Sequence, residues 1–190
     1  MLKIQHRVNR IEQLKILPLD YGVELDLRSN GEGLILHHDP FCKGDSFEEY
    51  LKHYRHQFMI LNTKEEGLES AILALLAKYH IRDYFFLDLS LPFLIKHMNQ
   101  GLKDIAVRFS EYEPLPFVLN FKEKVKWVWV DCFSDLPLTP ALYSKLHPHF
   151  KLCLVSPELQ GHPLDYIETF KKQLEGCPID AVCTKRPDLW

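Results

Sequence analysis

The sequence has little of several features that mark common classes of protein. It contains only 8 glycines and 12 prolines among 190 residues, which excludes collagen-like and low-complexity chains. It has no basic excess, because 23 lysines and arginines stand against 26 aspartates and glutamates, a formal net charge of −3. Nucleic acids and anionic membrane surfaces are bound through clusters of positive charge, so neither is an expected partner.

Cysteine and long apolar runs are also scarce. The five cysteines are odd in number and include no Cys-x-x-Cys pair. We therefore expect reduced thiols in a cytoplasmic protein, with no disulfide framework and no structural zinc. No uncharged apolar run has the length of a membrane span, and the opening residues lack the apolar stretch of a signal peptide. Neither a membrane span nor a signal peptide is therefore predicted.

A repeating pattern of short apolar runs is present. With 190 residues, 46% hydrophobic and 26% charged, the chain is long enough to form one domain with its own core, and we predict a single domain over residues 1–190. Each apolar run ends in a polar or charged residue and is followed by a turn and a helix-like stretch. Such runs are typical of parallel strands that are covered on both faces. They span residues 2–6, 22–27, 58–62, 84–88, 104–108, 127–131, 151–156 and 180–184.

Strands that alternate with helices predict an α/β fold, either a closed (β/α)8 barrel or an open, doubly wound sheet. No glycine-rich phosphate loop follows the first run, which disfavours a nucleotide-binding open sheet. We therefore predict a compact (β/α)8 TIM barrel with about 24 residues per unit. Only residues 185–190 follow the last run, so the final helix is expected to be missing. The expected helices span residues 9–17, 47–54, 65–79, 91–99, 114–122, 140–147 and 163–175.

Polar residues close the predicted strands. In barrels of this kind the chemistry lies at the carboxyl ends of the strands. The residues there are His6, Arg7, Glu24, Asp26, Asn62, Lys64, Asp88, Arg108, Asp131, Ser156 and Thr184. Capping of the following helix explains four of them equally well, and that alternative stays open for Asp88, Asp131, Ser156 and Thr184. Capping does not explain His6, Arg7, Glu24 or Lys64, so we regard this set as a candidate site, with Asp88, Arg108 and Asp131 as further pocket residues.

Glu24 and Asp26 are the strongest pair in this set. They are two residues apart in one strand, so their side chains lie on the same face. Two carboxylates in an apolar interior are costly unless a cation lies between them. Carboxylate oxygens suit a hard divalent ion, so we predict a Mg²⁺ or Ca²⁺ site. The alternative is an ion pair of these carboxylates with Arg7, Lys64 or Arg108.

A second unusual segment reads His37-His38-Asp39-Pro40. Gly31 and Gly33 precede it and predict a hairpin turn after the second strand. His38 differs from an ordinary surface histidine because Asp39 and Pro40 hold it in a tight turn, whereas alternation predicts that His37 points away.

Taken together, His6-Arg7, Glu24-x-Asp26 and His38-Asp39-Pro40 resemble the glycerophosphodiester phosphodiesterase family, within the superfamily of phosphatidylinositol-specific phospholipase C-like phosphodiesterases. The separation of 12 residues between Asp26 and His38 is similar to that of the family pattern. The family's Asn-Thr helix opening, third-strand Glu-x-Lys and terminal Thr-Asp-Arg-Pro resemble residues 9–10, 62–64 and 184–187 respectively.

The resemblance implies a metal-dependent phosphodiesterase that hydrolyses a small glycerol- or sugar-linked phosphodiester. By this resemblance Arg7 and Lys64 hold the phosphate, and a divalent cation lies on Glu24, Asp26 and Asn62. His6 and His38 are then the general base and general acid.

The sequence departs from the family at two positions. Val8 replaces the glycine of His-Arg-Gly, and Asn62 replaces an acidic metal ligand, so the cation is expected to bind weakly. Two other functions remain open: a catalytically weakened barrel that acts as a binding or regulatory protein, and another barrel enzyme with Lys64 as its amine. The leaving alcohol, the identity of the metal and the oligomeric state are not specified.

Overall fold

The structure is a computed structural model that describes all residues 1–190. The chain divides into two compact units, one formed by Met1–Gln5 with Met98–Trp190 and the other by His6–His97. Both are mixed α/β structures, as the sequence predicts. That the chain forms a single domain stays a prediction.

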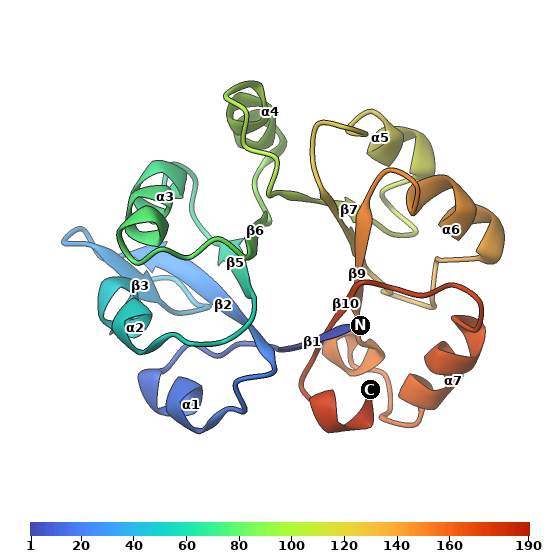
Figure 1. The fold of residues 1–190 in the computed structure, drawn as a ribbon, viewed down its shortest axis with the longest axis horizontal. Coiled ribbons are helices and arrows are strands. Elements are labelled where there is room, and N and C mark those ends of the chain that lie inside the picture. The colour runs from blue at the N-terminus through green and yellow to red at the C-terminus, as the bar shows by residue number, and fades with distance from the viewer. The chain divides into compact units, whose positions relative to one another are not determined.

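The His6–His97 unit contains the sheet that carries the candidate site. Parallel strands β2 (Gly22–Ser29), β5 (Met59–Thr63) and β6 (Tyr84–Leu87) lie in the order β2-β5-β6. A hairpin adds β3 (Leu34–Leu36) antiparallel to β2, and β4 (Asp45–Ser46) then pairs with β3. The helices are α1 (Ile11–Ile16), α2 (Phe47–His53), α3 (Glu69–Lys78) and α4 (Leu91–Asn99), which extends two residues past the unit (Figure 1).

The other unit is a parallel sheet in the order β1-β10-β9-β8-β7. Its strands are β1 (Leu2–Gln5), β7 (Ala106–Phe109), β8 (Trp127–Val130), β9 (Lys151–Val155) and β10 (Ala181–Thr184). Its helices are α5 (Leu115–Leu119), α6 (Pro140–Leu146) and α7 (Tyr166–Gln173), with 3-10 helices η1 (Pro157–Gln160) and η2 (Pro187–Leu189). Local signals place α6, because Pro140 opens it and the Thr139 hydroxyl accepts a hydrogen bond from the Leu142 amide.

All eight apolar runs contain a strand, and the core explains why. Val23, Leu25 and Leu27 of β2 are fully buried, and so are the residues between them, Glu24 at 1% and Asp26 at 0% exposure. Burial of both faces is the condition that makes parallel strands continuously apolar. The two polar residues on β2 are therefore exceptions that require a local explanation.

Two elements differ from their predicted form. The third helix begins at Glu69 rather than at residue 65, because Gly67 takes a left-handed conformation with φ +88°, which a helix cannot contain.

The hairpin turn predicted from Gly31 and Gly33 is confirmed by the antiparallel pairing of β2 and β3. The two-residue strand β4 was not predicted, because so short a segment has no periodicity to detect. After β10 the chain forms only η2, and the missing final helix stays a prediction.

No helix in the structure combines the length and apolar character that a membrane crossing requires.

Candidate functional site

The register of β2 and β5 places three polar side chains together. Asp26 is opposite Asn62 in the parallel pairing, and Glu24 lies two residues earlier on the same face as Asp26. The Asn62 amide nitrogen donates a hydrogen bond to Glu24 Oε1 over 2.9 Å. Because Asn62 is only 7% exposed, these three side chains form a buried polar cluster at the carboxyl end of the sheet. The sequence predicted this grouping.

The segment before α1 closes over one side of the cluster. Arg7 has a left-handed backbone (φ 56°), and its amide donates to Glu24 Oε2 over 2.8 Å. Its side chain is half-exposed, with Nε 3.9 Å from Asp26 Oδ2. His6 Nε2 lies 3.7 Å from Glu24 Oε2. Both residues that the sequence assigned to this loop therefore face the carboxylate pair.

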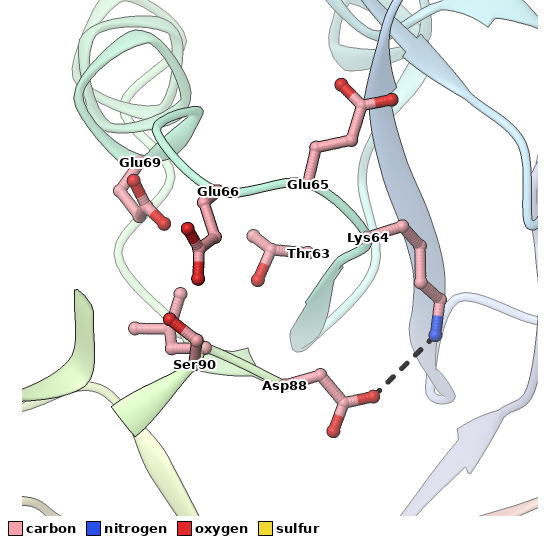
Figure 2. Close-up of a pocket in the computed structure, with 8 residues that line it drawn as sticks. Thr63, Lys64, Glu65, Glu66, Glu69, Asp88 and Ser90 are labelled. Carbon is pink, nitrogen blue, oxygen red and sulfur yellow. Dashed lines mark ion pairs between the residues drawn. The ribbon is translucent and has the colours of Figure 1, made fainter. Parts of the chain in front are cut away.

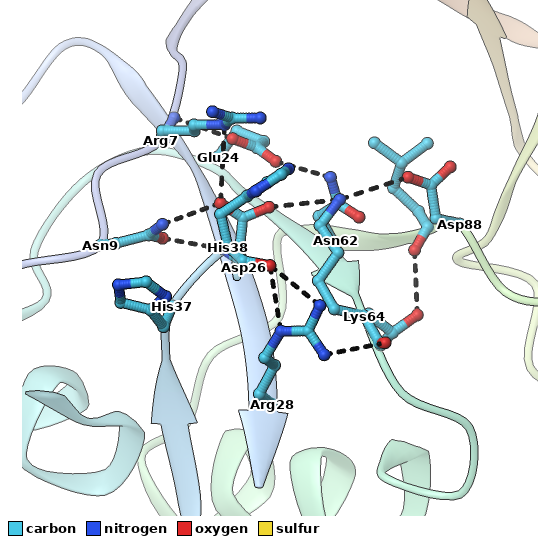
Figure 3. Close-up of polar contacts among 12 residues, drawn as sticks. Arg7, Asn9, Glu24, Asp26, Arg28, His37, His38, Asn62, Lys64 and Asp88 are labelled. Carbon is cyan, nitrogen blue, oxygen red and sulfur yellow. Dashed lines mark hydrogen bonds and ion pairs between the residues drawn. The ribbon is translucent and has the colours of Figure 1, made fainter. Parts of the chain in front are cut away.

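Lys64 closes the other side of the cluster (Figure 3). Its Nζ lies 3.3 Å from Asp26 Oδ1 and 3.6 Å from Asp88 Oδ2. Asp88 directly follows β6 and has a left-handed backbone with φ 63°. A left-handed non-glycine residue costs of order 1–3 kcal/mol and persists where the surrounding structure requires it. Asp88 and Arg7 are two such residues, and both border this cluster.

The proximity of the two carboxylates changes the acidity of Glu24. Burial, and then the neighbouring Asp26, raise the pKa of Glu24 to about 7, against the opposing hydrogen bonds from Asn62 and the Arg7 amide. A raised pKa is the result expected when two like charges share one buried site. Near pH 7 Glu24 is therefore protonated in a much larger fraction of molecules than an ordinary carboxylate.

His38 follows β3 and is oriented by its neighbour. Its Nδ1 is 2.8 Å from Asp39 Oδ1, and the hydrogen bond with His38 lowers the pKa of Asp39. His38, Arg7 and Asn9 help to line an open cavity of about 540 Å³. His37 also lines this cavity, which differs from the prediction that it points away. The reason is that β3 ends at Leu36, so strand alternation does not extend to the histidines.

A smaller cavity of about 140 Å³ lies on the Lys64 side (Figure 2). Lys64 and Asp88 form part of its wall, together with Thr63, Glu65, Glu66, Glu69, Leu89 and Ser90. The cluster thus has one cavity on the side of His38 and another on the side of Lys64.

The oxygen atoms of this cluster are of the kind that a divalent cation binds. Asp26 Oδ1 and Asn62 Oδ1 are buried and accept no hydrogen bond, although the Lys64 ammonium lies near the former. Unpartnered buried acceptors of this kind are costly without a cation or donor. The third member is Glu24, so the set offers two carboxylates and one amide. Nowhere do three His, Cys, Asp or Glu side chains gather as a metal centre. Any cation here therefore relies on the Asn62 carbonyl.

Arg108 and Asp131 belong to the other unit and contact each other there. Asp131 is 1% exposed and also accepts hydrogen bonds from the Gln160 side chain and the Cys132 amide. Its proposed role as a helix cap is wrong, because Thr139 is the residue that caps α6. That Arg108 and Asp131 share one pocket with the Glu24 cluster stays a prediction.

Ser156 and Thr184, for which a capping role was also open, differ from it as well. The Ser156 side chain makes no cap hydrogen bond to η1, which it precedes. The Thr184 hydroxyl donates to Glu158 Oε1 over 2.6 Å and accepts from the Arg186 amide over 2.9 Å. Ser156 and Thr184 are thus held in a local polar network of the unit that also contains Arg108 and Asp131.

Two residues of the site were not identified as site residues from the sequence. Asn9 exchanges two hydrogen bonds of 2.8 Å with Asp26, one from its amide to Oδ2 and one from the Asp26 backbone N–H to its Oδ1. Arg28 continues the polar face of β2 and contacts the backbone of His38. The alternation Glu24-x-Asp26-x-Arg28 could have identified Arg28. Asn9 was noted only as a helix opening, and no periodicity signals its contact with Asp26.

Comparison with known structures shows what the fold resembles. A glycerophosphodiester phosphodiesterase from Agrobacterium tumefaciens str. C58 matches with a TM-score of 0.74 and 13% identity, over 99% of this chain and 97% of that one. This chain has the fold of a glycerophosphodiester phosphodiesterase. A glycerophosphoryl diester phosphodiesterase from Parabacteroides distasonis ATCC 8503 matches with a TM-score of 0.68 and 11% identity, over 99% of this chain and 84% of that one.

Sequence comparison alone does not make this connection. No family model matches the chain, and no curated protein matches it. The resemblance to glycerophosphodiester phosphodiesterases that the motifs predict is confirmed through the fold.

Proposed function

We propose that the protein is a phosphoric diester hydrolase of the glycerophosphodiester phosphodiesterase type, a (β/α)8 barrel that acts on a small glycerol- or sugar-linked phosphodiester. The observation that supports it most is the buried Glu24–Asp26 pair, which lies between two cations, Arg7 and Lys64, at the carboxyl end of a sheet. The fold shared with two phosphodiesterases supports the same assignment.

In this proposal Arg7 and Lys64 bind the phosphate oxygens. Lys64 is suited to this because Asp26 and Asp88 hold its ammonium group in place. Arg7 is half-exposed beside the larger cavity, so its guanidinium is accessible to a phosphate. Together they place two positive charges where the diester carries one negative charge.

The proton transfers are assigned to the two histidines. His6 accepts the proton of a hydroxyl group on the substrate, and the oxygen of that hydroxyl forms a bond to phosphorus. The bond from phosphorus to the leaving alcohol breaks, and His38 donates a proton to the departing oxygen, which gives a cyclic phosphate and a free alcohol. Water then attacks the phosphorus of the cyclic phosphate and gives its proton to His38, while the ring P–O bond breaks and its oxygen takes a proton from His6, which gives a phosphomonoester and completes the hydrolysis. Asp39 orients the His38 ring through Nδ1, so Nε2 is the nitrogen available for this donation.

Glu24, Asp26 and Asn62 would hold a divalent cation, Mg²⁺ or Ca²⁺. When bound, such an ion supplies Lewis-acid polarisation of the phosphoryl group. Because the Asn62 amide carries no charge, we expect weaker binding than at a site with three carboxylates.

A binding or regulatory protein on the same fold is the second candidate. Its support is specific: Asn62 donates to Glu24, and no three His, Cys, Asp or Glu side chains gather as a metal centre. Such a protein would bind a phosphodiester through Arg7 and Lys64 without turning it over.

Hydrolysis assays separate the two candidates. The proposal predicts that a glycerophosphodiester, whose free hydroxyl can attack phosphorus, is cleaved, and that Mg²⁺ or Ca²⁺ at millimolar levels increases the rate. Calorimetric titration should show cation binding in the same range. Saturable binding of a glycerophosphodiester without cleavage under any divalent cation would instead support the binding protein.

Replacement of Asn62 by aspartate tests the cation site directly. Asn62→Asp adds a third negative charge, so we expect cation affinity to rise about tenfold, because ligand charge sets affinity at oxygen sites. The same change removes the hydrogen bond to Glu24 Oε1, so the cation-free protein should melt at a lower temperature. Calorimetry and thermal unfolding with and without Ca²⁺ measure both effects.

Asn30→Asp is a matched control for this change. The exposed Asn30 side chain only accepts hydrogen bonds, from the Glu32 and Gly33 amides, and an aspartate keeps both. It should leave cation affinity unchanged. Equal affinity of Asn62→Asp and the unmodified protein would remove Asn62 from the cation site.

A further inference from the structure

Arg28 lies between the segment that contains His38 and the segment that contains Lys64. It is on β2 on the same face as Glu24 and Asp26, and its side chain is 14% exposed. Its Nε and Nη2 both donate to the backbone carbonyl of His38, over 3.0 and 2.9 Å. One buried guanidinium thus holds the carbonyl of the proposed general acid with two hydrogen bonds.

The third nitrogen of Arg28 reaches the other loop (Figure 3). Nη1 lies 3.4 Å from both the carbonyl oxygen of Lys64 and Glu65 Oε1. The second oxygen of Glu65 is fixed in turn by the Ser29 amide and hydroxyl, over 3.0 and 2.9 Å. The segment after β3 and the segment after β5 are therefore joined through the end of β2.

The chemistry of the side chain makes this connection specific to arginine. A guanidinium is a rigid planar group that donates in several fixed directions at once, whereas a lysine ammonium is a single flexible point. Only a guanidinium can donate to the His38 carbonyl and to the Lys64–Glu65 turn at the same time. His38 and Lys64 have to meet one phosphate from different strands, and a misplacement of about 1 Å can cost about 10²-fold in rate.

We infer that Arg28 is a positioning residue, which fixes the backbone of His38 relative to that of Lys64 without touching substrate. This inference rests on the proposed function, since it assigns Arg28 a role in the alignment of that reaction. It is distinct from the phosphate-binding role of Arg7, because the Arg28 donors face protein carbonyls and a carboxylate.

Kinetics of Arg28→Lys and Arg28→Ala test the inference. We expect kcat for a glycerophosphodiester to fall about 10–100-fold, with a much smaller change in KM, because alignment is lost and the phosphate contacts remain. Added guanidinium ion should restore part of the rate of Arg28→Ala, since it can occupy the vacated position. A contribution to folding alone would give neither the kcat-specific loss nor this rescue.

Arg55→Ala is the matched control. Arg55 is an exposed arginine of the same unit that donates to the carbonyl of its neighbour, Tyr54. It should leave kcat and KM unchanged and show no response to guanidinium. If Arg28→Lys is folded by circular dichroism and retains full kcat, or if both variants lose only stability, the inference is wrong.

A second measurement separates this inference from the proposed function. In backbone NMR spectra, Arg28→Lys should shift the amide resonances of residues 37–40 and of residues 63–66 together, whereas Glu65→Gln should mainly shift the second group. If the unmodified protein cleaves no phosphodiester, the proposed function fails, and the coupled shifts alone decide whether Arg28 joins the two loops. If only one group of amides moves, Arg28 does not join them.

Discussion

Replacement of His38 by alanine is expected to lower phosphodiester turnover by about 10²–10⁴-fold, the usual contribution of a positioned general acid or base. The residue follows β3, and its ring is held by Asp39 beside the cavity that Arg7 also lines. His6→Ala is expected to cause a loss of similar size, because His6 is the proposed general base and its Nε2 faces Glu24 on β2. Both variants should keep the fold, since neither ring belongs to the apolar core.

His37 provides the control for His38. It is adjacent in sequence and lines the same cavity, but its Nδ1 contacts the backbone of Asp39, whereas the His38 ring is held by the Asp39 carboxylate. His37→Ala should therefore reduce kcat far less than His38→Ala, by steady-state kinetics on the same substrate. If His37→Ala abolishes activity and His38→Ala does not, the assignment of the general acid is off by one residue.

Glu24→Gln is expected to stabilise the fold above pH 7 while it abolishes cation binding and catalysis. The pKa of Glu24 is raised to about 7, so between its unfolded pKa of 4.5 and that value the folded protein binds more protons than the unfolded chain. The free energy of unfolding therefore falls as pH rises through this window, by about 3 kcal/mol. Glutamine carries no charge at any pH, so the free energy of unfolding of Glu24→Gln does not fall in this window.

Urea unfolding at pH 4 and at pH 8 measures the effect. The advantage of Glu24→Gln over the unmodified protein should be near zero at pH 4 and close to its full value at pH 8. Glu32→Gln, an exposed residue in the hairpin loop, should show no such dependence on pH. Addition of Ca²⁺ at pH 8 should stabilise the unmodified protein and not Glu24→Gln, because only the native site binds the ion. Equal stability of the two proteins at both pH values would contradict the raised pKa.

Much of the fold was predictable from the sequence because its strands are buried on both faces. Burial makes each strand an uninterrupted apolar run, and β5 (Met59–Thr63) and β8 (Trp127–Val130) were recognisable for that reason. The start of α3 was not predictable in this way. Glu65 and Glu66 are good helix formers, but both lie in the loop before the helix. There the ion pair of Glu65 with Arg28 and the left-handed Gly67 determine the conformation.

The candidate site was predictable where alternation along one strand applies. Glu24 and Asp26 were placed on one face by their spacing alone, and their shared burial follows from it. The part of the site that is formed by loops was harder to predict from the sequence. The contact of Asn9 with Asp26 and the orientation of His37 arise from turns, in which no sequence period relates neighbouring residues. The family resemblance named Asn9 only as part of a helix opening and did not name His37.

The central claim is that the Glu24–Asp26 cluster supports hydrolysis of a phosphodiester with the help of a divalent cation. The most direct measurement is ³¹P NMR of a glycerophosphodiester incubated with the purified protein, in EDTA and in millimolar Mg²⁺ or Ca²⁺. The account predicts loss of the diester signal and growth of a cyclic phosphate or phosphomonoester signal with the cation, at a rate strongly reduced in EDTA and in Glu24→Gln. An unchanged diester signal under every cation, or cleavage that Glu24→Gln leaves intact, would contradict it.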